Sequence, residues 1–189
     1  MHQSFSNTCF QIKLSYRFQG DHGHAALMTI DGTDFPIYEP TQWSPSWFSQ
    51  KFNGPGVRYE VAVAINTGDI CWINGPFPCG RFPDLKIFKI GLKQRLHQTE
   101  RVWADRGYRG DLKCITPCDA VSDAHSVEMG IARARHETIN GRFADWQCLN
   151  QVWRHQRSKH NMTFQAIAMV TQLAQINGFR SFQVTNNQH

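Results

Sequence analysis

Short apolar runs that stop at turn-forming residues constrain the fold of this chain more than any other feature of its sequence. The run 25–30 ends at Asp31-Gly32-Thr33-Asp34, and the run 101–104 ends at Asp105-Arg106-Gly107-Tyr108. Runs of this length that end at Asp and Gly are typical of buried strands that lead into turns. We therefore predict two strands that stop just before Asp31 and Asp105, with 35–37 resuming the first strand.

A hairpin is predicted between these two strands. Segment 59–66 is rich in valine, residues 67–69 break it with Thr-Gly-Asp, and 70–73 reads as the returning strand. Residues 75–80, with two prolines and two glycines, are expected to form a loop.

Helical spacing appears in the rest of the chain. Apolar residues recur at helical intervals after Pro83-Asp84, and a long stretch over 127–153 predicts one or two helices. A last helix is expected over 164–176, with Thr163 as its N-cap and Gly178 at its end. Strands, a crossover helix, another strand and further helices together predict a single α/β domain with a mixed sheet.

Composition excludes some classes of protein. The chain has 189 residues, of which 41% are hydrophobic, and its longest aliphatic stretch, 166–170, is far shorter than the roughly 20 residues that span a bilayer. No basic segment followed by an apolar run opens the sequence, so neither a membrane protein nor a secreted protein is expected.

The charge favours an anionic partner. The net charge is +5, and 13 of the 20 basic residues are arginines, whose planar guanidinium suits phosphate. Residues 133–160 carry six basic residues against two acidic ones, a net charge of +4. The six cysteines show no zinc-site spacing and are expected to be free thiols in a reducing compartment.

Three acidic residues are candidates for a common site. Asp31 and Asp105 are each predicted to follow a strand, and Glu137 lies on a helix that would cover such a sheet. Strand ends in α/β sheets are places where side chains from distant parts of the sequence converge. Taken singly, each residue also has an ordinary explanation, because Asp and Gly are common in turns and Glu137 lies between basic residues on a helix.

Together the three carboxylates would need a cation, since like charges that are brought close repel one another. Mg²⁺ takes oxygen ligands, and two such ions about 3.5–4 Å apart can activate the attacking oxygen and stabilise the leaving oxygen in phosphodiester cleavage. The basic segment beside Glu137 would then hold the nucleic-acid backbone.

Six motifs in order resemble those of transposase-derived DDE superfamily endonucleases, among them the Harbinger and related insertion-sequence transposases. They are Asp31-Gly32-Thr33-Asp34-Phe35; Lys51-Phe52 with Gly56-x-Arg58-Tyr59-Glu60-Val61; Trp72-Ile73-Asn74-Gly75-Pro76-Phe77-Pro78-Cys79-Gly80; Pro83-Asp84-x3-Phe88; Ala104-Asp105-Arg106-Gly107-Tyr108-Arg109-Gly110; and Arg133-x-Arg135-His136-Glu137-Thr138-Ile139-Asn140. The resemblance covers residues 18–182, leaving an N-terminal segment 1–17 outside it and a C-terminal tail 183–189.

The resemblance implies an RNase H-like fold in one domain, a mixed sheet flanked by helices. It also implies a catalytic and metal-binding triad of Asp31, Asp105 and Glu137, holding two Mg²⁺ or Mn²⁺ ions for DNA cleavage. Asp34 competes with Asp31 for the first position, but the motif favours Asp31. Asp84 matches a family aspartate, and we interpret it as a helix N-cap rather than a metal ligand.

Further residues are candidates for contacts with DNA. Phosphate contacts are predicted for four arginines: Arg106, Arg133, Arg135 and Arg142. Pairing with acidic neighbours is the alternative for Arg133 and Arg135. Trp43, Trp47 and Phe48 suit either base stacking or packing in the protein.

DNA is the expected partner. Because few residues precede Asp31, a separate DNA-binding protein is expected to supply target recognition, and a homo-oligomer is a further expectation. Location inside the cell is expected, in the nucleus if the source is eukaryotic. An alternative function stays open: a domesticated or decayed transposase domain that binds DNA or a protein partner without catalysis.

Overall fold

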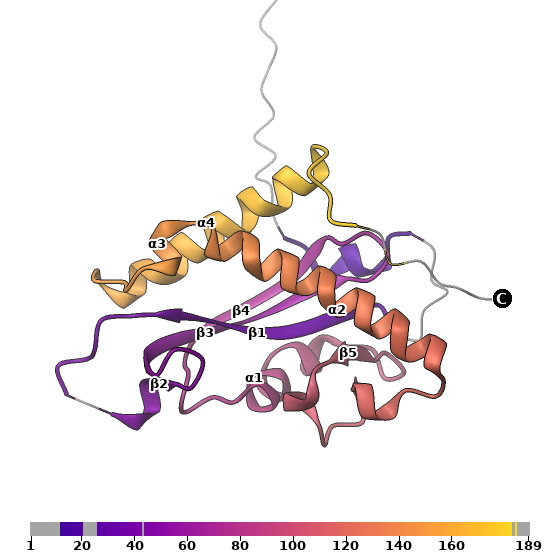
Figure 1. The fold of residues 1–189 in the computed structure, drawn as a ribbon, viewed down its shortest axis with the longest axis horizontal. Coiled ribbons are helices and arrows are strands. Elements are labelled where there is room, and N and C mark those ends of the chain that lie inside the picture. Colours follow the sequence, from indigo (N-terminus) through magenta and orange to yellow (C-terminus); the bar gives the residue numbers. More distant parts are fainter. Residues whose placement is uncertain (1–11, 21–25, 43, 183, 185–189) are drawn as a thin grey trace, which may run out of the picture.

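The computed structural model describes residues 12–20, 26–42, 44–182 and 184. A six-stranded mixed sheet forms its centre, with α1 on one face and α2 and α4 on the other (Figure 1). This arrangement confirms the predicted single-domain, RNase H-like α/β fold.

The elements follow one another along the described chain in this order: η1 (Leu14–Phe18), β1 (Met28–Pro36), η2 (Pro45–Trp47), β2 (Phe48–Ser49), β3 (Gly54–Ala64), β4 (Ile70–Pro78), α1 (Asp84–Ile90), η3 (Leu92–Arg95), β5 (Val102–Ala104), η4 (Arg106–Tyr108), β6 (Cys114–Ile115), η5 (Pro117–Asp119), α2 (Asp123–Ala144), α3 (Gln147–Asn150) and α4 (Arg157–Ile176).

The sheet combines an antiparallel half and a parallel half. β3 pairs antiparallel with β1, β2 and β4, while β5 pairs parallel with both β1 and β6. β1 is therefore central, and its register places Asp31 opposite Val61 of β3 and Ile30 opposite Ala104 of β5.

Alternation along β1 divides its side chains between the two layers of helices. Met28 and Ile30 pack in the core under α1, and Phe88 belongs to the same core. Phe35 packs in the core under α2 and α4, which contains Phe143. Asp31, an odd-numbered residue, consequently lies on the α2 face.

Two predicted strand ends were wrong. β1 continues through Asp31-Gly32-Thr33-Asp34 to Pro36, because these residues keep their pairing with β3. β4 also continues to Pro78, through the segment expected to be a loop. β4 pairs with β3 alone among the described strands, and such an edge strand tolerates proline, which lacks an N–H for the ladder.

Several helix ends differ from those predicted, although α4 ends at Ile176 as expected. α1 ends at Ile90, and η3 continues the chain after Gly91. α4 begins at Arg157, so Thr163 is inside the helix and is not its N-cap. The predicted stop at Gly178 agrees with its φ of 106°, which a glycine adopts readily.

The five cysteines within the described residues are free thiols, as predicted. None of the described helices is both long enough and apolar enough to cross a membrane.

A buried histidine makes the stability of the α4 layer depend on pH. His160 is fully buried; its Nδ1 and the hydroxyl of Tyr59 are hydrogen-bonded at 2.8 Å, and the two rings stack. Burial lowers the pKa of His160 to about 4. The unfolded chain therefore takes up a proton near pH 6.5 that the folded protein takes up only near pH 4.

We predict that acid destabilises the wild-type protein more than His160→Phe. Stability linked to this group falls by about 1.4 kcal/mol for each pH unit between about 6.5 and 4. Urea unfolding at pH 7 and pH 5 should show the wild-type free energy of unfolding dropping by about 2 kcal/mol relative to the variant. An unchanged difference between the two proteins at both pH values would contradict this prediction.

Candidate active site

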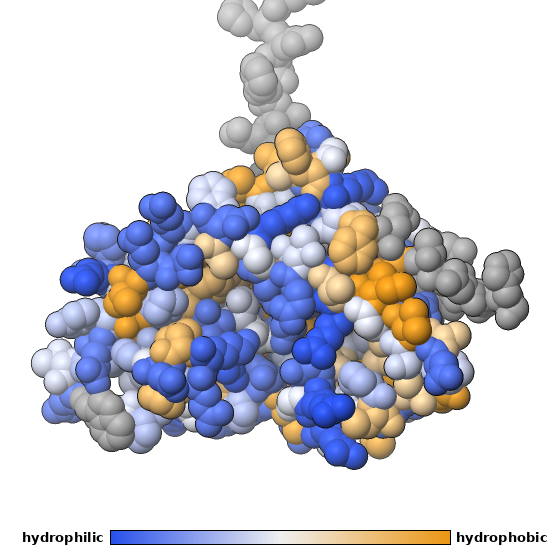
Figure 2. Space-filling view, in the orientation of Figure 1, coloured by the Kyte–Doolittle hydropathy of each residue, from blue (hydrophilic) through white to orange (hydrophobic). Residues whose placement is uncertain are grey.

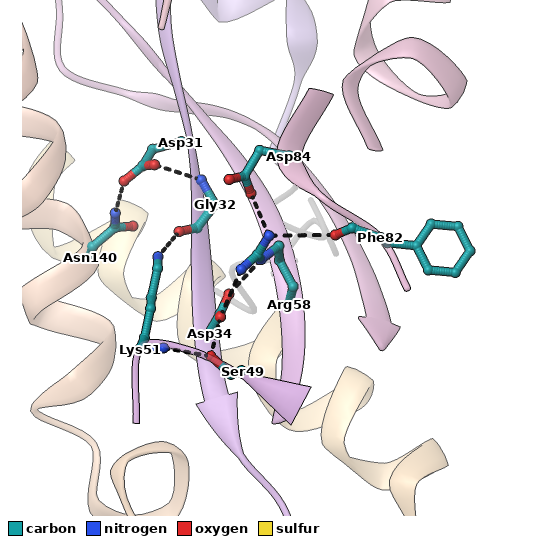
Figure 3. A network of polar contacts seen from close by, with 9 residues as sticks. All are labelled: Asp31, Gly32, Asp34, Ser49, Lys51, Arg58, Phe82, Asp84 and Asn140. Atoms are coloured by element: carbon teal, nitrogen blue, oxygen red, sulfur yellow. Dashed lines mark hydrogen bonds and ion pairs between the residues drawn. The ribbon is translucent and has the colours of Figure 1, made fainter. Parts of the chain in front are cut away.

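Two hydrogen bonds join β1 to α2 and position the centre of the site. Nδ1 of His136 and the hydroxyl of Thr29 are hydrogen-bonded at 2.8 Å. Figure 3 shows the second bond, in which Nδ2 of Asn140 donates to Oδ2 of Asp31 at 3.0 Å. Thr29 and Asp31 are two apart on a strand, and His136 and Asn140 are four apart on a helix, so each pair shares a face. Glu137 is the next residue of α2, and its charge acts on Asp31.

Asp105 enters the site from the neighbouring parallel strand. It follows Ala104, the last residue of β5, as predicted, and its Oδ1 accepts a hydrogen bond of 2.8 Å from the N–H of Gly107. A Cβ at Gly107 would lie 3.0 Å from this oxygen and 3.3 Å from Oδ2 of Asp84. Asp105 and Asp84 therefore approach the same point.

Asp84 is part of this acidic neighbourhood and is not the predicted N-cap. Pro83 is the N-cap of α1, and Asp84 is the first helical residue. Oδ1 of Asp84 forms an ion pair of 3.1 Å with Nη1 of Arg58. A Cβ at Gly32 would clash with this oxygen, so a glycine on β1 makes room for the carboxylate.

Asp34 has a structural role. Arg58 and Ser49 both donate hydrogen bonds to its carboxylate, at 2.6 Å from Nε of Arg58 and 2.6 Å from the Ser49 hydroxyl (Figure 3). Burial acts to raise the pKa of Asp34, but these hydrogen bonds hold it below its usual value. Asp34 is thus committed to Arg58, which leaves Asp31 as the first acidic residue of the site.

Negative charges gather around Asp31. Burial above all, and then the nearby charges of Glu137 and Asp105, raise the pKa of Asp31 to about 7. The Lys51 ammonium and the N–H of Gly32 oppose this rise. Lys51 is held close by its hydrogen bond of 2.6 Å to the carbonyl of Gly32 (Figure 3). The structure therefore brings Glu137 and Asp105 within electrostatic reach of Asp31.

Two buried groups extend the acidic neighbourhood under α1. Burial raises the pKa of Glu60 to about 8, although the Trp72 indole donates a hydrogen bond of 2.9 Å to its Oε1. Burial, followed by the charges of Asp84 and Glu60, raises the pKa of Tyr108. The Tyr108 hydroxyl is buried and has no hydrogen-bond partner among the described residues.

The chemistry of the donors suits a hard divalent cation. Asp31, Asp105 and Glu137 offer carboxylate oxygens, and the buried Oδ1 of Asn140 has no hydrogen-bond partner in the described part of the chain. The side chains, however, do not enclose an ion as they stand. Within residues 12–20, 26–42, 44–182 and 184, no group of three or more His, Cys, Asp or Glu side chains is arranged to hold a metal.

The four predicted phosphate-binding arginines differ in their surroundings. Arg106 and Arg133 are exposed, and Arg142 is half-buried. Hydrophilic side chains cover much of the face that α2 crosses (Figure 2).

The prediction that Arg135 contacts DNA phosphate was wrong. It is 1% exposed, and its Nη2 donates to the carbonyls of Ala64, at 2.8 Å, and Ile65, at the end of β3. Burial lowers its pKa to about 10. Arg135 therefore fastens α2 to the sheet and does not face DNA.

The aromatic candidates separate in a similar way. Trp47 packs against the core under α2 and α4, and the guanidinium of Arg157 lies 4.5 Å from the centre of the Trp47 ring. Phe48 is 41% exposed. Trp43 lies outside the described residues.

Sequence reasoning assigned no role to several residues that organise the site. Lys51, Arg58, His136 and Asn140 all occur in the quoted motifs. Asn140 follows Glu137 by three positions, so helical spacing alone could have placed both on one face. The contacts of Lys51 and Arg58 depend on β1–β3 pairing and carry no local signal.

Comparison with known proteins agrees with this fold. Residues 30–172, about three quarters of the chain, match the family of DDE superfamily endonucleases, and the chain belongs to that family. Endonucleases of this family act on DNA and generally use divalent metal ions. Searches of curated proteins and of solved structures found no match.

The contrast between Arg135 and Arg133 yields a prediction. Arg135→Met should lower the free energy of unfolding by about 1–3 kcal/mol, because it removes the side-chain donor to the carbonyl of Ile65, whereas the carbonyl of Ala64 still accepts a hydrogen bond from the N–H of Gly68. Arg133→Met, two positions away on the same helix, should leave stability within about 0.5 kcal/mol of wild type. Chemical unfolding measures both, and equal stability of the two variants would contradict the structural role of Arg135.

Proposed function

We propose that this chain is a transposase-type catalytic domain that cleaves DNA phosphodiester bonds with Mg²⁺ or Mn²⁺ held by Asp31, Asp105 and Glu137. The observation that carries the proposal is that Asp105, at the end of β5, and Glu137, on α2, both act electrostatically on Asp31 of β1. Such coupling is unfavourable without a cation and favours binding of one.

The ions would polarise the phosphoryl oxygens and lower the pKa of water. The protein's own residues supply position and charge. Asn140 orients the Asp31 carboxylate through their hydrogen bond of 3.0 Å. Outer groups of this kind typically change metal affinity or activity by about 10–100-fold.

Arg58 keeps the remaining carboxylates in place beside the site. It pairs with Asp34 and Asp84, so it balances two negative charges next to the proposed metal ligands. Asp84 approaches Asp105 at Gly107 and is a further oxygen donor close to the ions. The exposed Arg106 and Arg133, with Arg142, are proposed to hold the phosphates of the DNA backbone.

A second candidate function is binding of DNA or a protein partner without catalysis, as in a domesticated or decayed domain. The observation that favours it is the lack, among the described side chains, of a set already arranged to hold a metal. The two candidates differ in their response to Mn²⁺ and in their dependence on the three acids.

Plasmid nicking tests the catalytic proposal. With Mn²⁺ present, Asp105→Asn and Glu137→Gln should each lower the rate at which supercoiled plasmid is nicked by more than about 100-fold. Asparagine can still accept the hydrogen bond from Gly107, so the local turn is kept. Asp145→Asn, an exposed acid at the end of α2, is the matched control and should nick like wild type. Equal nicking by all four proteins would refute the role of the triad.

Thermal unfolding with Mn²⁺ tests the metal site separately from activity. An ion that binds only the folded state at 100 times its dissociation constant adds about 2.7 kcal/mol of stability, so the wild-type Tm should rise. Glu137→Gln should lose most of this rise, while Asp145→Asn should keep it. A wild-type Tm that stays constant in millimolar Mn²⁺, with and without DNA, would favour the non-catalytic alternative.

A further inference from the structure

A cavity of about 220 Å³ opens beside the proposed catalytic acids. The first residues of β1 and the end of β5 form one side, and α2 forms the other. Asp31 and Asp105 are among the residues that line it, so the cavity adjoins the site described above. None of the roles proposed above uses the space itself.

The walls of the cavity are largely apolar. Trp103 and Met129 line it with side chains that are almost completely buried. Ile30 and Ala104 also line it, although their side chains belong to the core under α1. An aromatic and aliphatic lining of this kind suits the flat face of a ring rather than a phosphate or another ion.

One buried polar atom remains available in this lining. His136 is 2% exposed, and its Nδ1 is occupied by Thr29. Its Nε2 is buried, with no hydrogen-bond partner among the residues that the structure describes. A buried polar atom without a partner is costly, and a ligand that offers a hydrogen bond would remove that cost.

The size of the cavity restricts the ligand. A cavity of about 150 Å³ can hold benzene, whereas drug-sized ligands occupy pockets of about 300–1,000 Å³. A volume of about 220 Å³ therefore fits one planar heterocycle and is too small for a base pair. Arg133, which is exposed, also lines the cavity and can reach a phosphate outside it.

We propose that this cavity receives a single nucleobase, turned out of the DNA next to the phosphate on which Asp31, Asp105 and Glu137 act. The proposal rests on the proposed function for its DNA substrate. The base would lie between Trp103 and Met129, with an edge toward His136, while Arg133 pairs with the backbone. The cavity thus gives the protein a means of fixing the position of the scissile phosphate.

Gly130 offers a way to fill the cavity without disturbing the core. Along α2, Ser126, Met129, Gly130 and Arg133 line the cavity at helical spacing. A Cβ at Gly130 would meet nothing within 4 Å, so Gly130→Leu adds its side chain in open space. Glycine is a poor residue inside a helix, so the substitution should also raise the Tm slightly.

Gly141→Leu is the matched control. Gly141 lies on the same helix, three turns further on and outside the cavity lining, and its Cβ would also meet nothing within 4 Å. Circular dichroism melts of the two variants show that each is folded.

The test compares two duplexes that differ only in one base. One oligonucleotide duplex carries a single unpaired adenine, and the other carries an abasic residue at the same position. Fluorescence anisotropy in EDTA measures the Kd of the full chain for each, so catalysis does not contribute. The wild-type protein and Gly141→Leu should bind the adenine duplex about tenfold more tightly than the abasic duplex. Gly130→Leu should bind the two duplexes equally.

Three results would overturn the proposal. These are equal binding of both duplexes by the wild-type protein, a base preference that Gly130→Leu keeps, and binding of neither duplex. Equal binding combined with Mn²⁺-dependent nicking removes the base pocket and leaves the nuclease function standing. A base preference combined with nicking that does not depend on Asp105 removes the nuclease function and leaves the pocket.

Discussion

The pairing of β1 with α2 through Thr29–His136 and Asp31–Asn140 is the contact on which the rest of the site depends. It fixes α2 across the strand, places Glu137 near Asp31 and leaves the cavity at Trp103 between helix and sheet. The buried Arg135 strengthens the same junction through the carbonyls at the end of β3. Helix position, acidic site and cavity therefore follow from one interface.

The carboxylates around β1 lie in two different electrostatic environments. Burial and the nearby acids make the charged form of Asp31 unfavourable, whereas Arg58 keeps Asp34 ionised and also pairs with Asp84. The protein thus separates two kinds of carboxylate around one strand. Those on the α1 face of β1 are neutralised internally, and those toward α2 and the end of β5 have no comparable ion pair among the described residues.

Much of the fold followed from the sequence because its signals are local. Apolar runs indicated β1, β3 and β5, and helical spacing indicated α2. The continuation of β1 through Asp31 could not be predicted locally, since it depends on pairing with β3 and on Asp84 packing where Gly32 lacks a side chain. The triad came from the resemblance of motifs to a family.

Other features of the site depend on tertiary structure. The Asp31–Asn140 bond joins residues 109 positions apart, and no local pattern marks it. Arg135 looked like a DNA contact because the sequence shows its charge but not which face of α2 is buried. The cavity is equally invisible in the sequence, because its lining comes from β1, β5, Asp105, η5 and α2.

Anomalous diffraction from crystals soaked with Mn²⁺ tests the central claim most directly. The account predicts anomalous density between the carboxylates of Asp31, Asp105 and Glu137, with these side chains closed around the ion. Anomalous density at other parts of the surface, with none between these three carboxylates, would contradict it.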